Sequence, residues 1–204
     1  MRDLPRKDIF LITKVSREHL AYRDVHEAMR GSLERLQTHY VDLYLVHKEN
    51  PVIPLSETMK AMEEIADRGL ARFIGVSNFS DTLMKEAQSY LDHTRIAANQ
   101  IEYNLTERSA EHATIPYCKE HDVTIIAQRP FSKGALFARG LPMVDSLAKK
   151  YDKTRAQIML NWIMANGMVP IPKTMDESHL KENYAALGWN LEEADVLELN
   201  NLQA

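Results

Sequence analysis

The sequence predicts an α/β protein of the (β/α)8 barrel type, incomplete, with six strand–helix units and an extra helix near the C-terminal end. Six short, apolar, β-branched runs are each followed by a stretch of helical pattern. Neither G-x-G-x-x-G nor G-x-x-x-x-G-K-[ST] occurs, although a doubly wound nucleotide-binding fold needs such a loop. Polar residues follow each run, and the carboxyl ends of barrel strands form the catalytic face. The alternation of strands and helices fits either a doubly wound sheet or a barrel, and the other two observations favour the barrel.

The strands are expected to be buried on both faces, because their apolar residues are nearly continuous rather than alternating. No Ser/Gly-rich linker separates them, so residues 1–204 are expected to form a single domain. The expected strands are Ile9–Lys14, Val41–His47, Arg72–Ser77, Ile96–Ile101, Val123–Gln128 and Met168–Pro172.

Helices are expected where apolar residues recur at a spacing of three or four and where capping residues precede them. A loop with Gly134 and Gly140 is expected after the fifth strand. The expected helices are Arg23–Gln37, Leu55–Ala66, Ser80 or Asp81 to Tyr90, Thr106 or Ser109 to Glu120, Pro142–Tyr151, Thr154–Asn166, Asp176–Leu187 and Leu191–Leu202.

Composition narrows the class of protein. The chain has 204 residues, and 25 Lys and Arg against 29 Asp and Glu give a formal charge of −4, which argues against nucleic acid as a partner. The single cysteine, Cys118, excludes an intrachain disulfide and a cysteine-based zinc cluster, and it suits the reducing cytoplasm. No apolar run approaches the roughly 18 residues of a membrane span, so no membrane partner is expected.

Polar residues at all six strand ends are the candidate site. At any one position the ordinary explanation is that strand ends meet polar turns. Six successive polar ends favour a catalytic rim instead. These residues are Lys14, His47, Ser77 with Asn78, Gln100, Gln128 with Arg129, and Lys173 with Thr174.

Five motifs in this order resemble the aldo-keto reductase family of NAD(P)H-dependent oxidoreductases. They are Ile12-Thr-Lys14, Val41-Asp-Leu-Tyr-Leu-Val-His47, Gly75-Val-Ser-Asn-Phe79, Asn99-Gln-Ile-Glu102 and Ile171-Pro-Lys-Thr174, followed by Glu182-Asn183. The resemblance implies hydride transfer between a nicotinamide cofactor and a small aldehyde or ketone, in a barrel that needs no glycine-rich loop.

The resemblance also implies a role for each matching residue. Lys14 matches a lysine that favours the phenolate of a catalytic tyrosine, and His47 matches a histidine that orients the carbonyl. NADP(H) is the favoured cofactor, NAD(H) is an alternative, and no metal ion is implied. The cofactor-binding residues implied are Ser77, Asn78 and Gln100 at the nicotinamide, Gln128 beside it, Pro130 and Ser132 at the pyrophosphate, Lys173, Thr174 and His179 at the phosphorylated ribose, and Glu182 and Asn183 at the adenine.

The sequence departs from the family pattern at several positions. The segment Asp-Thr-Ala-x-x-Tyr, which carries the family's catalytic Asp and Tyr, does not occur, and the chain is expected to be about three-quarters of a barrel. Gln128 stands where many relatives stack a tyrosine on the nicotinamide. Lys48-Glu49 replaces a frequent Trp-Pro, and His179 stands where NADPH-preferring members commonly carry arginine.

Three functions remain open from the sequence. The first is an aldo-keto reductase whose amino-terminal part is missing and which is inactive as this chain alone. The second is a non-catalytic nicotinamide-binding or scaffold subunit, and the third is an unrelated barrel enzyme such as a phosphate-sugar isomerase. Self-association through the first and last strands is expected, because their outer edges have no partner.

Overall fold

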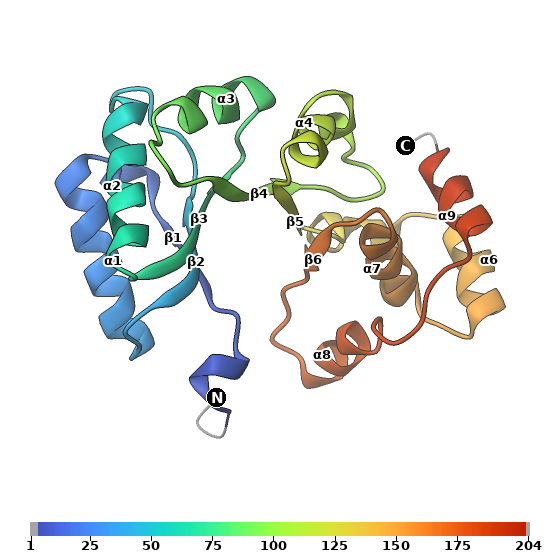
Figure 1. Cartoon of the computed structure of the whole chain (residues 1–204). Coiled ribbons are helices and arrows are strands. Elements are labelled where there is room, and N and C mark those ends of the chain that lie inside the picture. Colours follow the sequence, from blue (N-terminus) through green and yellow to red (C-terminus); the bar gives the residue numbers. More distant parts are fainter. Residues whose placement is uncertain (1–3, 203–204) are drawn as a thin grey trace. The chain divides into compact units, whose positions relative to one another are not determined.

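The structure is a computed structural model that describes residues 4–202 (Figure 1). Six strands follow one another in chain order across one sheet, and the pairs β1–β2, β2–β3 and β5–β6 are parallel. Helices follow the strands, so the predicted α/β class is confirmed. The strands are β1 (Ile12–Val15), β2 (Val41–Val46), β3 (Ala71–Ser77), β4 (Ile96–Glu102), β5 (Thr124–Gln128) and β6 (Val169–Ile171).

The chain divides into two compact units, each with its own core. Among the described residues, the first unit holds 4–99 and 117–123, and the second holds 100–116 and 124–202. The boundary falls within β4, after Asn99.

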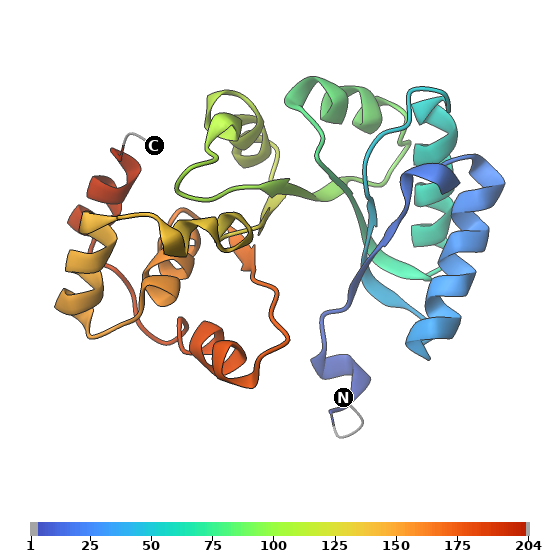
Figure 2. The ribbon, with the colours of Figure 1, turned by 180° about the vertical axis from the view of Figure 1, so that it is seen from behind.

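In the first unit, helices cover one face of β1–β3. Helices α1 (Tyr22–Leu36) and α2 (Leu55–Asp67) lie side by side against these strands in both views (Figures 1 and 2). Their apolar residues Met29 and Met62 are fully buried. Helix α3 (Asp81–Ser89) begins at Ser80, whose hydroxyl accepts a hydrogen bond from the Leu83 backbone N–H, so Ser80 rather than Asp81 is the cap.

β1 is shorter at its start than the sequence predicted. Residues Arg6–Asp8 form a short 3-10 turn, and the strand begins at Ile12 rather than Ile9. The Leu11 backbone N–H donates to Oδ2 of Asp42 at 2.8 Å, and so it makes no ladder bond. The Asp42 carboxylate therefore takes the backbone donor of Leu11, while the Leu11 carbonyl still accepts from β2. A second 3-10 turn, Arg17–His19, precedes α1.

The segment after β4 also differs from the prediction. A continuous helix was expected up to Glu120, but a 3-10 turn at Ser109–His112 is followed by α4 at Thr114–Glu120. Pro116 lies in the first turn of α4, where its missing N–H removes no helical hydrogen bond. Proline in mid-helix would have broken the longer element, which explains the restart.

The second unit is mainly helical apart from its strands. Thr154 and Gln157 form a capping box at the start of α7, as their spacing predicts. The core centres on Trp162, which stacks on Tyr103 with ring centroids 5.2 Å apart. The expected loop after β5 contains a 3-10 turn, Ser132–Gly134, and the short helix α5 (Ala135–Ala138). The remaining helices are α6 (Pro142–Tyr151), α7 (Arg155–Ala165), α8 (Glu177–Tyr184) and α9 (Glu193–Asn200).

Candidate functional site

Lys14 and His47 lie on the same face of the sheet in the first unit. Lys14 is in register with Leu45, and His47 follows Leu45 by two residues. Because side chains alternate along a strand and registered neighbours in parallel strands point the same way, Lys14, Leu45 and His47 share a face. Ser77 shares it too, two residues beyond Gly75, the β3 partner of Leu45. Three of the predicted rim residues are thus on one face.

The surroundings of Lys14 change the chemistry of its amine. Lys14 is half-buried near the end of β1, and burial lowers the pKa of its ammonium group. His47 is exposed, and its backbone N–H donates to the Val15 carbonyl at 3.0 Å. The chain is therefore fixed at His47 while its imidazole remains accessible.

Ser77 and Asn78 join the ends of two strands. Ser77 is fully buried, and Asn78 has a left-handed backbone with φ of 61°, which asparagine tolerates better than most residues. Asn78 Nδ2 donates to Ser77 Oγ at 3.0 Å and to the His47 carbonyl at 3.2 Å. The turn after β3 is thereby tied to the residue that follows β2.

Neither nearby tyrosine is suited to act as a proton donor. Tyr44 lies on the opposite strand face from His47, is fully buried, and its hydroxyl has no hydrogen-bond partner within residues 4–202. The Tyr103 hydroxyl donates to Glu111 at 2.6 Å. Burial raises the pKa of both phenols, which makes each a weaker acid.

In the second unit, Gln100 and Gln128 form a pair. Gln100 Nε2 donates to Gln128 Oε1 at 2.9 Å, and Gln100 is 3% exposed. The Tyr103 backbone N–H donates to the Gln128 carbonyl at 3.2 Å, which fixes the end of β5 against the segment after β4.

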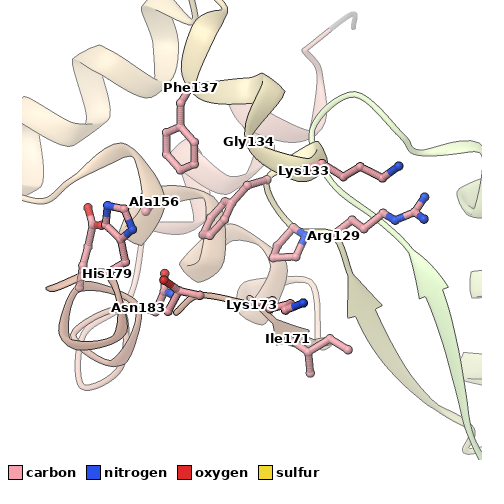
Figure 3. Close-up of a pocket in the computed structure, with 13 residues that line it drawn as sticks. Arg129, Lys133, Gly134, Phe137, Ala156, Ile171, Lys173, His179 and Asn183 are labelled. Carbon is pink, nitrogen blue, oxygen red and sulfur yellow. The ribbon is translucent and has the colours of Figure 1, made fainter. Parts of the chain in front are cut away.

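A pocket of about 870 Å³ lies wholly within the second unit (Figure 3). His179 and Asn183, both on α8, lie on one side, while Arg129 and Lys133 extend to the other. Its volume lies in the range of small-molecule and cofactor sites. The lining residues are Arg129, Pro130, Phe131, Lys133, Gly134, Phe137, Ala156, Ile171, Lys173, Thr174, His179, Glu182 and Asn183.

The segment after β5 that forms one wall has an unusual backbone. Ser132, Lys133 and Gly134 are all left-handed, with φ of 48°, 58° and 91°. Non-glycine residues in this conformation cost about 1 kcal/mol each or more, and such outliers cluster at ligand-binding sites. The rings of Phe131 and Phe137 pack with centroids 5.1 Å apart and give this wall an apolar surface.

The amino end of α8 is capped by a carboxylate. Lys173 and Thr174 precede this end in the sequence. Asp176 Oδ1 accepts the His179 backbone N–H at 3.0 Å, and the Asp176 backbone N–H donates to Thr174 Oγ1 at 3.0 Å. Because a carboxylate already lies at the helix amino end, the positive charge around the pocket comes from the side chains of Lys173, Lys133 and Arg129 rather than from the helix dipole.

The structure brings six predicted cofactor residues together in this pocket. Ser132 belongs to the wall segment but is not among the lining residues. Phe137 and Ala156 line the pocket without having been singled out from the sequence, because Phe137 falls in the segment expected as a loop and Ala156 is an alanine in an expected helix. The six are Pro130, Lys173, Thr174, His179, Glu182 and Asn183.

Comparison with known proteins decides the family. A profile of the Aldo/keto reductase family matches residues 2–204. The chain belongs to the aldo/keto reductase family. It is 30% identical over 199 residues to methylglyoxal reductase YeaE of Escherichia coli (strain K12), covering 96% of this chain and 70% of that protein.

Solved aldo-keto reductases share the fold. The thermostable aldo-keto reductase Tm1743, solved with the inhibitor epalrestat, superposes with a TM-score of 0.90 at 36% identity, over 98% of this chain and 73% of that one. A Bombyx mori aldo-keto reductase solved in complex with NADP gives 0.85 at 30% identity, over 97% and 68%. The (β/α)8 relationship predicted from the strand pattern is confirmed.

Two further features concern the described residues only. Within residues 4–202, no helix combines the length and the apolar character needed to cross a membrane. In the same part of the chain, no group of three or more His, Cys, Asp or Glu side chains is placed to hold a metal ion.

Proposed function

We propose that this aldo-keto reductase chain binds NADP(H) through the pocket of its second unit. The observation that carries the proposal is the convergence of Lys173, Thr174 and His179 with Glu182 and Asn183 on one pocket of sufficient volume. The family's reductases use NADPH, and the Bombyx mori relative was solved with NADP. NAD(H) is the alternative cofactor, because no arginine stands at position 179.

The residues of the pocket fit the chemistry of a nucleotide with an extra phosphate. Lys173 is exposed and supplies a compact positive charge, and His179 adds ring nitrogens that can donate to phosphate oxygens. Glu182 and Asn183 offer acceptors and an amide to a purine edge. The left-handed segment after β5 adds the cationic side chains of Arg129 and Lys133 to the lining, which suits the charged pyrophosphate between the two nucleosides.

The bound nicotinamide would supply a hydride, and we propose that residues of the first unit handle the carbonyl. His47 is exposed and orients the substrate oxygen, while Lys14 lies on the same sheet face and provides positive charge. We propose that Ser77, Asn78, Gln100 and Gln128 hold the nicotinamide. The substrate is a small carbonyl compound, in keeping with the name of the Escherichia coli relative.

We propose further that this chain alone does not reduce carbonyls. The reaction needs an acid to protonate the forming alkoxide, and Tyr44 and Tyr103 are buried with raised pKa values. The printed sequence has no Asp-Thr-Ala-x-x-Tyr segment. The alternative function, a non-catalytic nicotinamide-binding or scaffold subunit, predicts the same lack of turnover.

Two measurements on the 204-residue chain test the proposal. Titration with NADPH and NADH, followed by cofactor fluorescence, should show saturable NADPH binding that Lys173→Met weakens about tenfold. NADPH oxidation with methylglyoxal should remain at background.

The outcomes separate the candidates. Binding of neither cofactor would overturn the cofactor site. Turnover with methylglyoxal would refute the need for a separate tyrosine. Turnover that appears only after a segment with Asp-Thr-Ala-x-x-Tyr is added favours the reductase. Tight cofactor binding without turnover, even when that segment is present, favours the scaffold subunit.

The edge strands support self-association as part of the proposal. Within residues 4–202, β1 pairs with β2 alone and β6 with β5 alone. Because the Leu11 carbonyl accepts from β2 and the Val15 carbonyl from His47 just after it, the backbone of Ile12 and Lys14 faces away from β2. Pro170 has no backbone N–H to donate, so the edge of β6 is less suited to pairing with another strand. Sedimentation velocity across a concentration series should show association, with slow amide exchange at Ile12 and Lys14; a monomer with fast exchange at both would argue against it.

We also propose that the two units form one domain and that the protein acts in the cytoplasm. The family profile runs through both units, which supports the first point, and Cys118 is a buried free thiol, which suits a reducing compartment. A single calorimetric unfolding transition and cell fractionation test these points.

A further inference from the structure

The pair formed by Gln100 and Gln128 has a defined polarity. The Nε2 of Gln100 is the donor and the Oε1 of Gln128 is the acceptor, at 2.9 Å. The backbone of Gln128 is held as well, because its carbonyl accepts from Tyr103 at 3.2 Å. Gln128 therefore presents its side-chain oxygen to Gln100 from a fixed position at the end of β5.

This polarity decides which end of the Gln100 amide is left for a ligand. A primary amide donates at nitrogen and accepts at oxygen, and its two ends have nearly the same shape. Within residues 4–202, the side chain of Gln100 makes one hydrogen bond, through its nitrogen to Gln128. Its oxygen is not among the buried side-chain atoms that lack a partner, so it is not sealed in the core and is left to accept from a donor such as a ligand NH2.

We infer that Gln128 is a positioning residue, which holds Gln100 in the orientation that accepts the NH2 of a nicotinamide carboxamide. This inference rests on the proposed cofactor site. The family resemblance implies a stacked tyrosine at position 128 in many relatives. In this chain a hydrogen bond to the neighbouring amide replaces that contact, so the ring is recognised by its carboxamide rather than by its face.

The mechanism predicts selectivity as well as affinity. The side-chain oxygen of Gln100 can accept a hydrogen bond from the NH2 of the carboxamide. The deamido cofactor carries a carboxylate instead, which has no donor and is repelled by an amide oxygen. NADPH should therefore bind more tightly than its deamido counterpart. A Gln100 side chain that is free to turn end for end can offer its nitrogen to the carboxylate, and the selectivity should then disappear.

Two substitutions of one residue make the test. Gln128→Met keeps the length of the side chain and removes the acceptor, while Gln128→Glu keeps an acceptor oxygen. Dissociation constants are measured for NADPH, for its deamido counterpart and for adenosine 2′,5′-bisphosphate, which carries no nicotinamide. A thermal melt of each variant checks that it is folded.

We expect Gln128→Met to weaken NADPH binding about fivefold, which corresponds to the loss of one hydrogen bond. In this variant the dissociation constants for NADPH and its deamido counterpart should become equal. The bisphosphate should bind equally to all three proteins, and Gln128→Glu should stay within about twofold of the wild type for NADPH. NADPH binding unchanged by Gln128→Met, or equal weakening of the bisphosphate, would overturn the positioning role. Failure of the wild type to bind NADPH would instead overturn the proposed function.

Discussion

The side chain of Leu45 on β2 lies across Gly75 on β3, its partner in register. A methyl group at Gly75 would stand 2.7 Å from Leu45 Cδ2 and 2.5 Å from the Ala98 carbonyl oxygen. Both distances are far below van der Waals contact. The glycine of the Gly75-Val-Ser-Asn-Phe79 motif is therefore required by packing, on the same face as Lys14 and His47.

Gly75→Ala should therefore destabilise the protein by about 1–3 kcal/mol, because a backbone carbonyl cannot yield as a flexible side chain does. Gly31→Ala is the matched control. Gly31 lies inside α1, where the added methyl meets only the end of the Arg35 side chain at 3.0 Å, and the change should stabilise by about 0.5–1 kcal/mol. Urea unfolding of both variants measures the difference, and equal effects would contradict the packing argument.

The buried carboxylate of Glu63 should be a main anchor of the segment between α3 and β4. It is 6% exposed and accepts the backbone N–H groups of Asp92, His93 and Thr94. Glu63→Gln places an NH2 group against these donors and should cost about 2 kcal/mol of stability at neutral pH. Glu57→Gln, an exposed position on the same helix, should stay within about 0.5 kcal/mol.

The same anchor should weaken in acid. The backbone hydrogen bonds outweigh burial and hold the pKa of Glu63 below its usual range. The carboxylate therefore contributes stability that is complete above its unfolded pKa and is lost as pH falls through the lower folded pKa. The stability difference between wild type and Glu63→Gln should shrink over that window. A difference that does not change with pH would mean that the charge is unimportant.

His93 should show the opposite pH dependence. Its Nε2 lies 2.8 Å from Asp67 Oδ1, and this partner, with Glu63, raises the pKa of the imidazole. The stabilisation is complete below the unfolded pKa and is lost as pH rises through the higher folded pKa. Histidine NMR titration should show the raised pKa, and Asp67→Asn should bring it back toward the ordinary value.

Lys14 should be unusually reactive for a lysine. Burial lowers the pKa of its amine, so at alkaline pH a larger fraction is uncharged than for a lysine with the ordinary pKa. Competitive acylation read by mass spectrometry across a pH series should give Lys14 a titration midpoint below the ordinary lysine value. A midpoint at the ordinary value would contradict the effect of burial.

Position 179 should set the preference between the two cofactors. His179 and Lys173 both line the pocket, and an imidazole ring cannot make the two parallel hydrogen bonds of a guanidinium group to phosphate, because its two nitrogens point in different directions. His179→Arg should tighten NADPH binding about tenfold and leave NADH binding unchanged. Equal tightening of NADPH and NADH binding would show that position 179 does not contact the 2′-phosphate.

Local patterns predicted a strand in each of the six places and most helices of the fold, since apolar runs and capping residues such as Thr154 are local signals. The expected burial of the strands on both faces is wrong for β6, where Val169 is 49% and Ile171 38% exposed. The start of β1 was wrong because Asp42, thirty-one residues away from Leu11, takes the first backbone donor. Such non-local competition leaves no trace in a short window. The restart at α4 could have been read from Pro116, whose place in a first turn is a local signal.

In the candidate site as well, features with a local sequence signal were predicted and those that depend on non-local contacts were not. Residues carried by ordered motifs, such as Lys173 and Asn183, line one pocket, and their part in cofactor binding stays a prediction. Phe137 was missed because the short helix α5 was expected as a loop, and Ala156 because an alanine in a helix has no chemical signature. The Gln100–Gln128 bond joins strands through side chains 28 positions apart, which no motif specifies.

Every residue that lines the large pocket lies at position 129 or beyond, whereas Lys14 and His47 both precede residue 50. With the proposed roles, a substitution at Lys14 or His47 changes the chemistry at the carbonyl and leaves the lining of the proposed nucleotide pocket untouched. The two functions can therefore change independently in evolution, and proteins built in this way can bind the same cofactor and act on different substrates.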